Sequence, residues 1–480
     1  MGFSPWAPRK PGSATPASNA TRARRTLVAE QALAPSHRDA LVPCTPRGTV
    51  DAQCAEDFVL AVGRTLFRRE LTDAEAQDFA AIAVAVAEDP KLADFHLGLE
   101  FALAALLQSP DFLYRVEVGS PEGDGTLRFD DVEMASRLAY FFWGVAPDAE
   151  LLDLAEADLL SDPATLEVQV DRLIADERIR GGVRAFFEEM LKLHKLPALE
   201  KDPSVLTAYS AELGLSAREQ TLRDLERLII EEDDDFRRFL TDAETHVDRT
   251  LAAVYRTPAP SIEAFAMTTL PEEQNRVGFL GQASFLALNS HAGSTSAVKR
   301  GKFVQEVFRC TPILPPPPNV NTTLPPASEE LATLRERVAV HLSSPACAGC
   351  HQMMDPIGLA FENFDALGSF RAEEQGATID PSGELNGVAF DTPEELARVL
   401  ADDPAFTQCV VQTVYRYATG RSAGPGDTIA LQELAQQFEE SRHRVLALMR
   451  AIAVDPRFWL AATQAGDDAT RCEPSEEKGT

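Results

Sequence analysis

Apolar residues along this chain recur mainly with the three- to four-residue spacing of an α-helix. Thr72 opens a capping box with Glu75, and the Ala- and Val-rich stretch that follows predicts a helix that stops at Pro90. A second strongly apolar segment is expected to end before Pro110, because the residue that precedes a proline disfavours the helical conformation. This second helix covers residues 95–107. The other helices predicted from the same pattern cover residues 131–143, 165–174, 182–193, 217–232 and 392–402.

Alternation of apolar and polar residues, which indicates a half-buried β-strand, extends nowhere in the chain beyond a few positions. The length of 480 residues exceeds what one hydrophobic core normally supports. We therefore predict a mainly α protein with several domains and little or no β structure. No stretch approaches the roughly 18 consecutive apolar residues of a membrane span, so no transmembrane helix is predicted.

The charge of the chain argues against two classes of partner. Its 75 acidic and 45 basic residues leave a formal net charge of −30. Such an excess of negative charge disfavours binding to nucleic acid or to an anionic membrane surface. Residues 1–40 are rich in Pro, Ser, Ala and Arg, and they lack the apolar core of a signal peptide.

One short stretch, Cys347-Ala-Gly-Cys350-His351, combines residue types and spacing that predict a specific chemistry. This C-x-x-C-H pattern is typical of the covalent attachment of one c-type haem. The two thiols are expected to bond the haem vinyl groups, and His351 is expected to be the proximal iron ligand. The alternatives are a zinc half-site, which would need two more thiolate or imidazole ligands, and a thioredoxin-like dithiol, which would need a βαβ setting.

Several residues could be the iron ligand on the opposite side of the haem. His291 is the leading candidate, because it lies in a loop rich in Gly, Ser and Thr instead of on an apolar helix face. Met449 is a second candidate, although its apolar stripe favours a place in the core, and Met353 and Met354 are expected to serve packing. An open or water-filled position would permit peroxidase-like chemistry, and His341 could hydrogen bond near the haem edge.

Charged residues on both sides of the motif suggest further interactions. Lys299, Arg300 and Lys302 form a basic cluster that could neutralise haem propionates or could simply be a solvated helix start. Asp355 and the acidic residues at 362–365 could bind a hard cation, but their spacing fits no EF-hand loop. Capping and turn formation after the motif helix is the favoured interpretation.

Four further cysteines could form disulfides. Cys44 and Cys54 flank a short loop that contains Pro and Gly and could close a small ring, and Cys310 and Cys409 could pair across domains. Buried free thiols are the alternative. Haem is attached outside the cytoplasm, so we expect a periplasmic or extracellular protein. Because no signal peptide is present, we expect the true start of the protein to lie upstream.

The segment from His341 to Asp365, which contains the motif, resembles a secreted cytochrome-like family abundant in planctomycetes and myxobacteria. Members of that family carry a series of adjacent domains of unknown function, and the resemblance extends over about residues 41 to 463. It implies a c-type haem protein of unestablished role, and His291 matches a histidine of the family pattern. The chain departs from the pattern in lacking the signal peptide and the extra N-terminal domain of many members. Other segments similar to the family are 107–115, 135–143, 290–301 and 415–421.

The helical pattern, the loop at 119–125 and the proline run at 315–318 divide the chain. The proline run is expected to be a stiff spacer, with a ligand for an aromatic-lined groove as the alternative. The expected divisions are a disordered segment over 1–40, a small helical domain over 41–120, a helical domain of unknown function over 126–262, a cytochrome-c-like haem domain over 263–375 with a polyproline segment at 315–326, a C-terminal helical domain over 376–463 and a disordered tail over 464–480.

These observations predict an exported monohaem protein that acts as an electron-transfer or redox module. Electron transfer is favoured over catalysis, because no nucleophile triad or phosphate-binding loop stands out. One alternative is a surface-associated binding or scaffold protein, in contact with a polymer or partner, whose haem is structural. Another is a haem enzyme with an open distal site. The redox partner, the substrate and the oligomeric state do not follow from the sequence.

Overall fold

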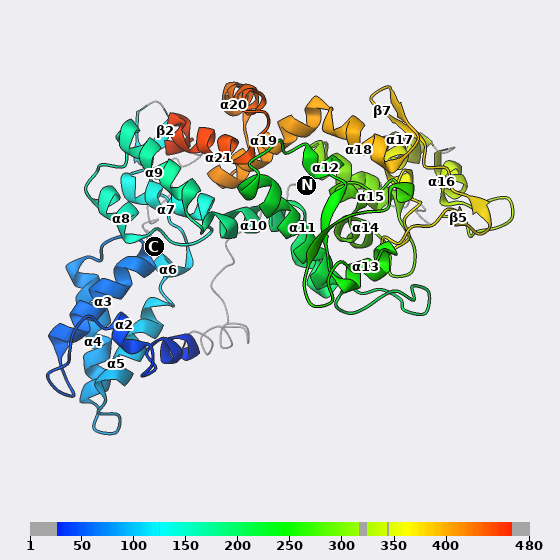
Figure 1. Cartoon of the computed structure of the whole chain (residues 1–480). Coiled ribbons are helices and arrows are strands. Elements are labelled where there is room, and N and C mark those ends of the chain that lie inside the picture. Colours follow the sequence, from blue (N-terminus) through cyan, green and yellow to red (C-terminus); the bar gives the residue numbers. More distant parts are fainter. Residues whose placement is uncertain (1–25, 124, 316–323, 343–344, 463–480) are drawn as a thin grey trace, which may run out of the picture. The chain divides into compact units, whose positions relative to one another are not determined.

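The structure, a computed structural model, describes residues 26–123, 125–315, 324–342 and 345–462. Within these residues the chain is mainly α-helical, as predicted, and its strands are only two to four residues long (Figure 1). No described helix is long and apolar enough to cross a membrane. The chain divides into a first unit of Met1–Tyr140, Val145–Gln169 and Trp459–Thr480 and a second unit of Phe141–Gly144 and Val170–Phe458.

Three packed helices form the core of the first unit, namely α3 (Ala52–Phe67), α4 (Asp73–Glu88) and α5 (Phe95–Leu106). The predicted capping box at the start of α4 is confirmed, because Thr72 and Glu75 each accept a hydrogen bond from the backbone N–H of the other. Where α4 and α5 cross, a Cβ on Gly98 would overlap the backbone oxygen of Ala83. Glycine therefore sets the close approach of these two helices.

Helical structure occurs in this unit earlier in the chain than the sequence predicted. Residues 26–32 are helical, α2 (Arg38–Leu41) follows, and Ala29 and Leu33 are fully buried in the core around α3 and α5. The prediction of a disordered segment over 1–40 is therefore wrong for residues 26–40. Ala29 and Leu33 are four residues apart and so share one face of a helix, but the Pro-, Ser-, Ala- and Arg-rich composition of residues 1–40 as a whole favoured disorder. Residues 1–25 and 463–480 lie outside the described residues.

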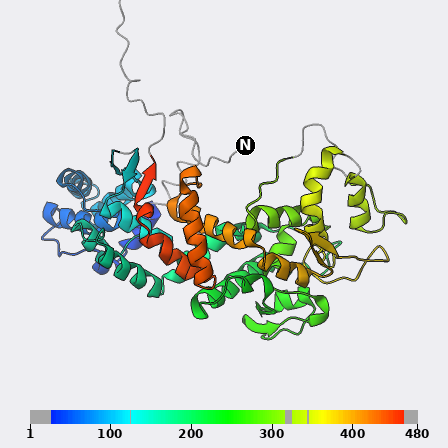
Figure 2. The same cartoon turned by 90° about the horizontal axis from the view of Figure 1, so that it is seen from above.

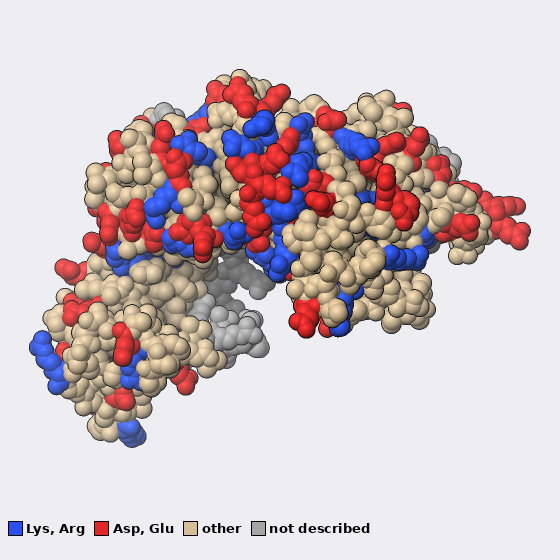
Figure 3. All heavy atoms as spheres, in the orientation of Figure 1, with Lys and Arg blue, Asp and Glu red and all other residues tan. Residues whose placement is uncertain are grey.

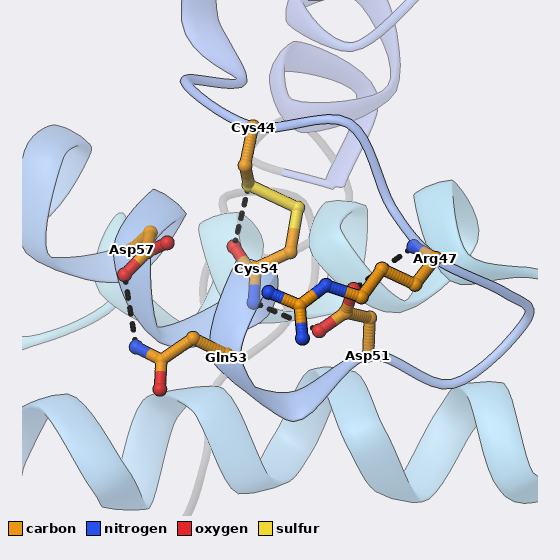
Figure 4. The surroundings of a disulfide bond; sticks show 6 residues. All are labelled: Cys44, Arg47, Asp51, Gln53, Cys54 and Asp57. Atoms are coloured by element: carbon orange, nitrogen blue, oxygen red, sulfur yellow. Dashed lines mark hydrogen bonds between the residues drawn. A yellow bond between two sulfur atoms is a disulfide. The ribbon is translucent and has the colours of Figure 1, made fainter.

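A disulfide closes the loop in front of α3, as predicted (Figure 4). Cys44 and Cys54 are 10 residues apart, and their Cα atoms are separated by 5.7 Å. Asp51 caps α3 by accepting hydrogen bonds from the backbone N–H of Cys54 at 3.2 Å and of Arg47 at 2.9 Å. The loop is thus held by one covalent bond and by the helix cap, and loop closure alone contributes about 2.7 kcal/mol.

Short helices and a small sheet connect the bundle of α3, α4 and α5 to the rest of the chain. Strand β2 pairs antiparallel with both β1 and β9. Ser109 begins a new helical turn instead of only ending α5, since its side chain accepts a hydrogen bond from the backbone N–H of Asp111. The elements are α6 (Pro110–Leu113), β1 (Ser120–Pro121), β2 (Thr126–Arg128), α7 (Asp131–Phe142), α8 (Ala149–Glu156), α9 (Pro163–Ala175) and β9 (Leu460–Ala462).

The second unit is built around a row of phenylalanine side chains. Phe236, Phe239 and Phe279 stack at centroid distances of 5.4 and 5.1 Å, and further rings continue the row in both directions. Aromatic rings in such contact stabilise a fold by more than the burial of their apolar area alone accounts for. The other members of the row are Phe187, Phe285, Phe303, Phe308, Phe361 and Phe406.

The middle of this unit contains the helices predicted there and one two-stranded antiparallel sheet. The helix predicted over 217–232 begins earlier, at Leu213, and changes at Arg227 into a π-helical turn. Strands β3 and β4 pair antiparallel, with Glu244 opposite Thr269. The elements are α10 (Ile179–Met190), η1 (Leu193–Ala198), α11 (Leu213–Glu226), η2 (Arg227–Glu231), α12 (Arg238–Thr241), β3 (Glu244–Val247), α13 (Arg249–Tyr255), β4 (Ala266–Thr269), η3 (Glu272–Gln274), η4 (Phe279–Gly281) and α14 (Ala283–Leu288).

The remainder of the unit carries the segment of the cysteine–histidine motif and the C-terminal helices. Its two hairpins, β5–β6 and β7–β8, have strands of two or three residues. The predicted helix over 392–402 is α18, capped by the side chain of Thr392. The elements are α15 (Ala297–Phe303), η5 (Val304–Phe308), α16 (Leu334–Leu342), α17 (Pro345–Leu359), β5 (Glu373–Glu374), β6 (Ala377–Thr378), β7 (Gly383–Leu385), β8 (Val388–Phe390), α18 (Pro393–Ala401), α19 (Pro404–Thr419), η6 (Pro425–Asp427), α20 (Thr428–Glu440), α21 (Val445–Val454) and η7 (Pro456–Trp459).

A second disulfide joins Cys310, two residues after the end of η5, to Cys409 in α19. Cys310 and Cys409 are 99 residues apart in the chain, and their Cα atoms lie 5.3 Å from one another. This predicted pair is confirmed. Two disulfides in one chain indicate an oxidising environment, since cytosolic thiols are normally kept reduced.

Acidic and basic side chains alternate on the face of the molecule shown in Figure 3, without separating into two large patches. Around α12, Arg238 contacts Asp234 at 2.7 Å and Asp242 at 3.1 Å, and Arg227 reaches Asp242 at 2.9 Å. Ion pairs at such partly exposed positions each contribute little to stability. Their main effect here is to disperse the negative charge of the chain.

Candidate haem site

The motif residues belong to α17, which packs against α15 and α16. These three helices lie in the region drawn in green to yellow at one side of both Figure 1 and Figure 2. A Cβ on Gly358 would overlap the backbone oxygen of Ala297, and one on Gly301 would overlap that of Met354. The early residues of α15 therefore face the late residues of α17, which means that the two helices run antiparallel in close contact.

The two glycines of α17 predict opposite effects of the same substitution. Gly358→Ala is expected to destabilise the protein by about 1–3 kcal/mol, because the new methyl group collides with the α15 backbone. Gly349→Ala, within the motif, is expected to stabilise it by about 0.5–1 kcal/mol, since a Cβ there meets no described atom within 4 Å. Urea unfolding of both variants measures the difference, and equal midpoints would contradict the packing described for α15 and α17.

Proline does not end the motif helix, contrary to the expectation of a turn at Asp355-Pro356. Pro356 lies inside α17, where it removes a backbone donor and displaces the carbonyl groups of the preceding turn. The side-chain amide of Gln305 donates to the carbonyl oxygen of Met353 at 2.7 Å. This bond satisfies a carbonyl next to the disrupted turn, and α17 continues to Leu359. Residues on both sides of the proline-disturbed turn consequently belong to one helix.

The imidazole of His351 is hydrogen bonded to the carboxylate of Asp355. Nδ1 of His351 lies 2.8 Å from Oδ2 of Asp355, and the two residues are one helical turn apart. The Asp355 side chain is 3% exposed and that of His351 is 17% exposed. Nδ1 is thus the ring nitrogen directed at the carboxylate. Sequence reasoning assigned Asp355 to a turn, although its spacing of four from His351 was the available signal.

The thiols of the motif can be described only in part. Cys350 is a free, partly buried cysteine one residue before His351. The side chains of Cys347 and His341 lie outside the described residues, so the structure places neither. The space beside Gly349 is open among the described atoms. A free thiol, an oriented imidazole and open space at the motif fit the donor set and the access that a covalently bound haem requires.

Arg300 is neither a ligand for propionates nor part of a solvated helix start, and both interpretations of it are wrong. Its side chain is fully buried, and burial lowers the pKa of its guanidinium to about 10. The guanidinium donates to the carbonyl oxygens of Phe361 at 2.7 Å, Phe364 at 3.0 Å and Asp365 at 2.8 Å. It holds the loop after α17 against α15. Lys302, by contrast, is partly exposed, 3.5 Å from a Glu306 oxygen.

The acidic residues after α17 serve the same loop. Glu362 is buried and accepts hydrogen bonds from Thr295 at 2.6 Å and Arg371 at 2.9 Å, while burial raises the pKa of its carboxyl group. Asp365 accepts from three successive backbone N–H groups, those of residues 367–369, which is the predicted turn. Among the described residues, no three His, Cys, Asp or Glu side chains gather as they would around a metal ion.

His291 lies in an exposed loop before α15. Its Nδ1 is 3.2 Å from Nζ of Lys299, and its carbonyl oxygen accepts from Nζ of Lys201 at 2.8 Å. Partial burial and these two cations lower the pKa of the His291 imidazole. It borders a cavity of about 600 Å³ whose wall also includes Ser296 and Val338.

The start of α15, six residues after His291, lies against the end of α17 that is remote from the motif. His291 precedes Ala297, and Ala297 packs against Gly358, whereas His351 lies about two turns earlier in α17. The lining of the cavity beside His291 includes no described α17 residue. The assignment of His291 as distal ligand stays a prediction.

The methionines considered as ligands or packing groups have different surroundings. Met449 is buried in α21, and Met354 is buried where α17 meets α15, so both serve packing as expected. Met353 is 42% exposed, which contradicts its expected packing role. It faces outward because α17 turns only its neighbour Met354 toward α15. Most of the polyproline segment at 315–326, namely residues 316–323, lies outside the described residues.

Comparison with known protein families gives four matches in a row. Residues 54–117 match a family described as protein of unknown function (DUF1595), and residues 129–256 match another, DUF1592. Residues 276–374, which contain the motif and Asp355, match a protein of unknown function (DUF1588), and residues 386–458 match DUF1585. No curated protein and no solved structure matches the chain. The chain is therefore a serial-domain protein, built from four consecutive segments that match families of unknown function.

Proposed function

We propose that this protein is an exported c-type haem protein that transfers electrons. In this proposal Cys347 and Cys350 hold the haem through thioether bonds, and His351 is an axial ligand of its iron. The observation that carries the proposal is the His351–Asp355 hydrogen bond within a C-x-x-C-H motif, next to the free thiol of Cys350. That bond orients the imidazole in the way that metal-ligating histidines generally require.

The chain's own residues have three tasks in this role. Cys350 offers a thiol that is not engaged in a disulfide, and α17 presents it beside His351. Asp355 fixes the imidazole ring, and the close packing of α15 on α17 keeps the motif helix in place. When bound, haem c supplies a one-electron iron couple. Electron transfer needs no substrate pocket, only an axial ligand and a path to a redox partner.

The disulfides support export. Both Cys44–Cys54 and Cys310–Cys409 need an oxidising compartment to persist, and c-type haem is attached in such a compartment. Each pair is buried or partly buried within one unit, so both are expected to form during folding. The proposal therefore places the chain in the periplasm or outside the cell.

Covalent haem attachment is the decisive test. The full chain, produced with an export signal and the haem-maturation machinery, is expected to give a haem-stained band on a denaturing gel at its own mass. The Cys347→Ser/Cys350→Ser variant is expected to lose the stain completely, because no thiol remains in the motif to form a thioether. The Cys44→Ser/Cys54→Ser variant also lacks two cysteines, but it is expected to keep the stain.

The outcomes separate the proposal from its rivals. An unstained wild-type protein, next to a stained control cytochrome from the same cells, would overturn the proposal. If the protein is stained, reversible reduction without a spectral change on adding CO supports electron transfer. CO binding to the reduced protein would instead indicate an open distal position and would contradict the electron-transfer role.

A further inference from the structure

Asp355 contacts the imidazole of the motif histidine from one helical turn further along α17. The distance between Nδ1 of His351 and Oδ2 of Asp355 is 2.8 Å. Positions four apart on a helix share one face, so the helix itself brings the two groups together. The pair therefore needs no loop closure and no other element to form.

The surroundings of Asp355 keep this contact in a poorly solvated place. Its side chain is 3% exposed, and the preceding residue, Met354, packs its backbone against Gly301 of α15. The neighbouring turn is held by the amide of Gln305 on the carbonyl oxygen of Met353. A carboxylate at such a site is costly to bury unless a hydrogen-bond donor faces it, and the His351 ring provides that donor.

The contact decides which ring nitrogen of a neutral His351 carries the proton. A carboxylate accepts hydrogen bonds, so Nδ1 must be protonated and Nε2 keeps its lone pair. The negative charge behind the ring also favours the more positive state of a metal bound at Nε2. These two effects follow from the geometry alone.

We infer that Asp355 is a positioning residue that selects Nε2 of His351 as the iron ligand and lowers the reduction potential of the site. This inference rests on the proposed function. Loss of a hydrogen-bonding partner behind a metal ligand typically changes metal affinity roughly 10- to 100-fold. If the 10- to 100-fold loss of affinity concerns ferric iron and not ferrous iron, the reduction potential rises by about 59 to 118 mV. The reason is that one tenfold step in a one-electron couple is about 59 mV.

The first experiment measures the midpoint potential of the haem-loaded full chain by redox titration. Asp355→Asn is expected to raise the potential by at least about 59 mV, because it removes the charge at nearly constant size. Asp355→Glu, which retains the charge, is expected to restore most of the wild-type value. Glu306→Gln removes a charge from η5, which packs near α17, and is expected to leave the potential unchanged.

The second experiment needs no haem. Selective ¹⁵N labelling of the 8 histidines in the full-length Cys347→Ser/Cys350→Ser protein allows the His351 tautomer to be read by NMR at about pH 9, where imidazoles are normally neutral. The Nδ1–H form is expected with Asp355, and the Nε2–H form is expected with Asp355→Leu. A tautomer that is the same in both proteins would overturn the selection of Nε2 by Asp355.

The two proposals fail in different ways. An unstained wild-type chain removes the proposed function, while the tautomer measurement still tests Asp355. A stained chain whose potential is the same in the Asp355→Asn and Glu306→Gln variants keeps the proposed function and overturns the inference. Thermal unfolding of each variant identifies any that has lost its fold, and the Asp355→Glu variant then supplies the comparison of potentials.

Discussion

Replacement of Arg300 by Met is expected to unfold most of the second unit under conditions in which the wild-type protein is stable. The guanidinium is fully buried and donates to the carbonyl oxygens of Phe361, Phe364 and Asp365 and, at 3.2 Å, to the hydroxyl of Ser290. Methionine fills a similar volume but donates nothing. Each acceptor left without a partner costs about 1–3 kcal/mol, so the total loss is expected to exceed about 5 kcal/mol.

That loss is comparable with the entire stability of an ordinary domain, which is about 5–15 kcal/mol. Urea unfolding followed by circular dichroism, together with hydrogen exchange of the α15 and α17 amides, measures it. Arg180→Met is the matched control, because Arg180 is 44% exposed and makes a surface pair with Glu231 at 3.2 Å. It is expected to change stability by less than about 0.5 kcal/mol. An Arg300→Met protein as stable as this control would show that the buried guanidinium does not hold the loop after α17.

Loss of the Cys310–Cys409 disulfide is expected to have the second largest effect. The bond connects residues 99 apart, and closing a loop of that length removes about 4.7 kcal/mol of chain entropy from the unfolded state. The Cys310→Ala/Cys409→Ala variant is therefore expected to unfold at a clearly lower urea concentration than the wild type. A reducing agent also opens Cys44–Cys54, so the second unit of the reduced wild-type protein is expected to unfold like that of the variant, and its first unit is expected to be destabilised as well.

The first disulfide provides an internal comparison. Cys44 and Cys54 close a loop of only 10 residues, for which the same reasoning gives about 2.7 kcal/mol. Replacement of that pair by Ala is expected to affect the unfolding of the first unit and to leave the transition of the second unit in place. A larger loss from the short loop than from the long one would contradict the loop-closure argument.

The helices of this protein were largely predictable because their signals are local. The capping box of Thr72 and Glu75 and the apolar stretch after it specify α4 without reference to any other element. The disulfide pairs were also predicted, although many pairings of the cysteines were possible. The short strands were not expected individually, since strands of two to four residues carry too little alternation to stand out.

Of the candidate site, the sequence predicts the covalent attachment of haem and its proximal ligand, and this stays a prediction. The spacing of Cys347, Cys350 and His351 points to haem attachment whatever surrounds the motif. Asp355 was assigned to capping or a turn after the motif helix. The helix continues there, and Gln305, 48 residues earlier than Met353, donates to the Met353 carbonyl beside the proline. The continuation of α17 past Pro356 thus involves a contact that the local pattern does not contain.

The sequence by itself determined the helical class, the helix caps, the motif and the possible disulfides, because each depends on residues a few positions apart or on the chemistry of single side chains. Only the tertiary structure decided that Arg300 is buried, that Ala29 and Leu33 join the core and that α17 continues past Pro356. The physical reason is that burial is a property of the packed neighbours. A charged or isolated apolar residue has the same local sequence whether a distant segment covers it or not.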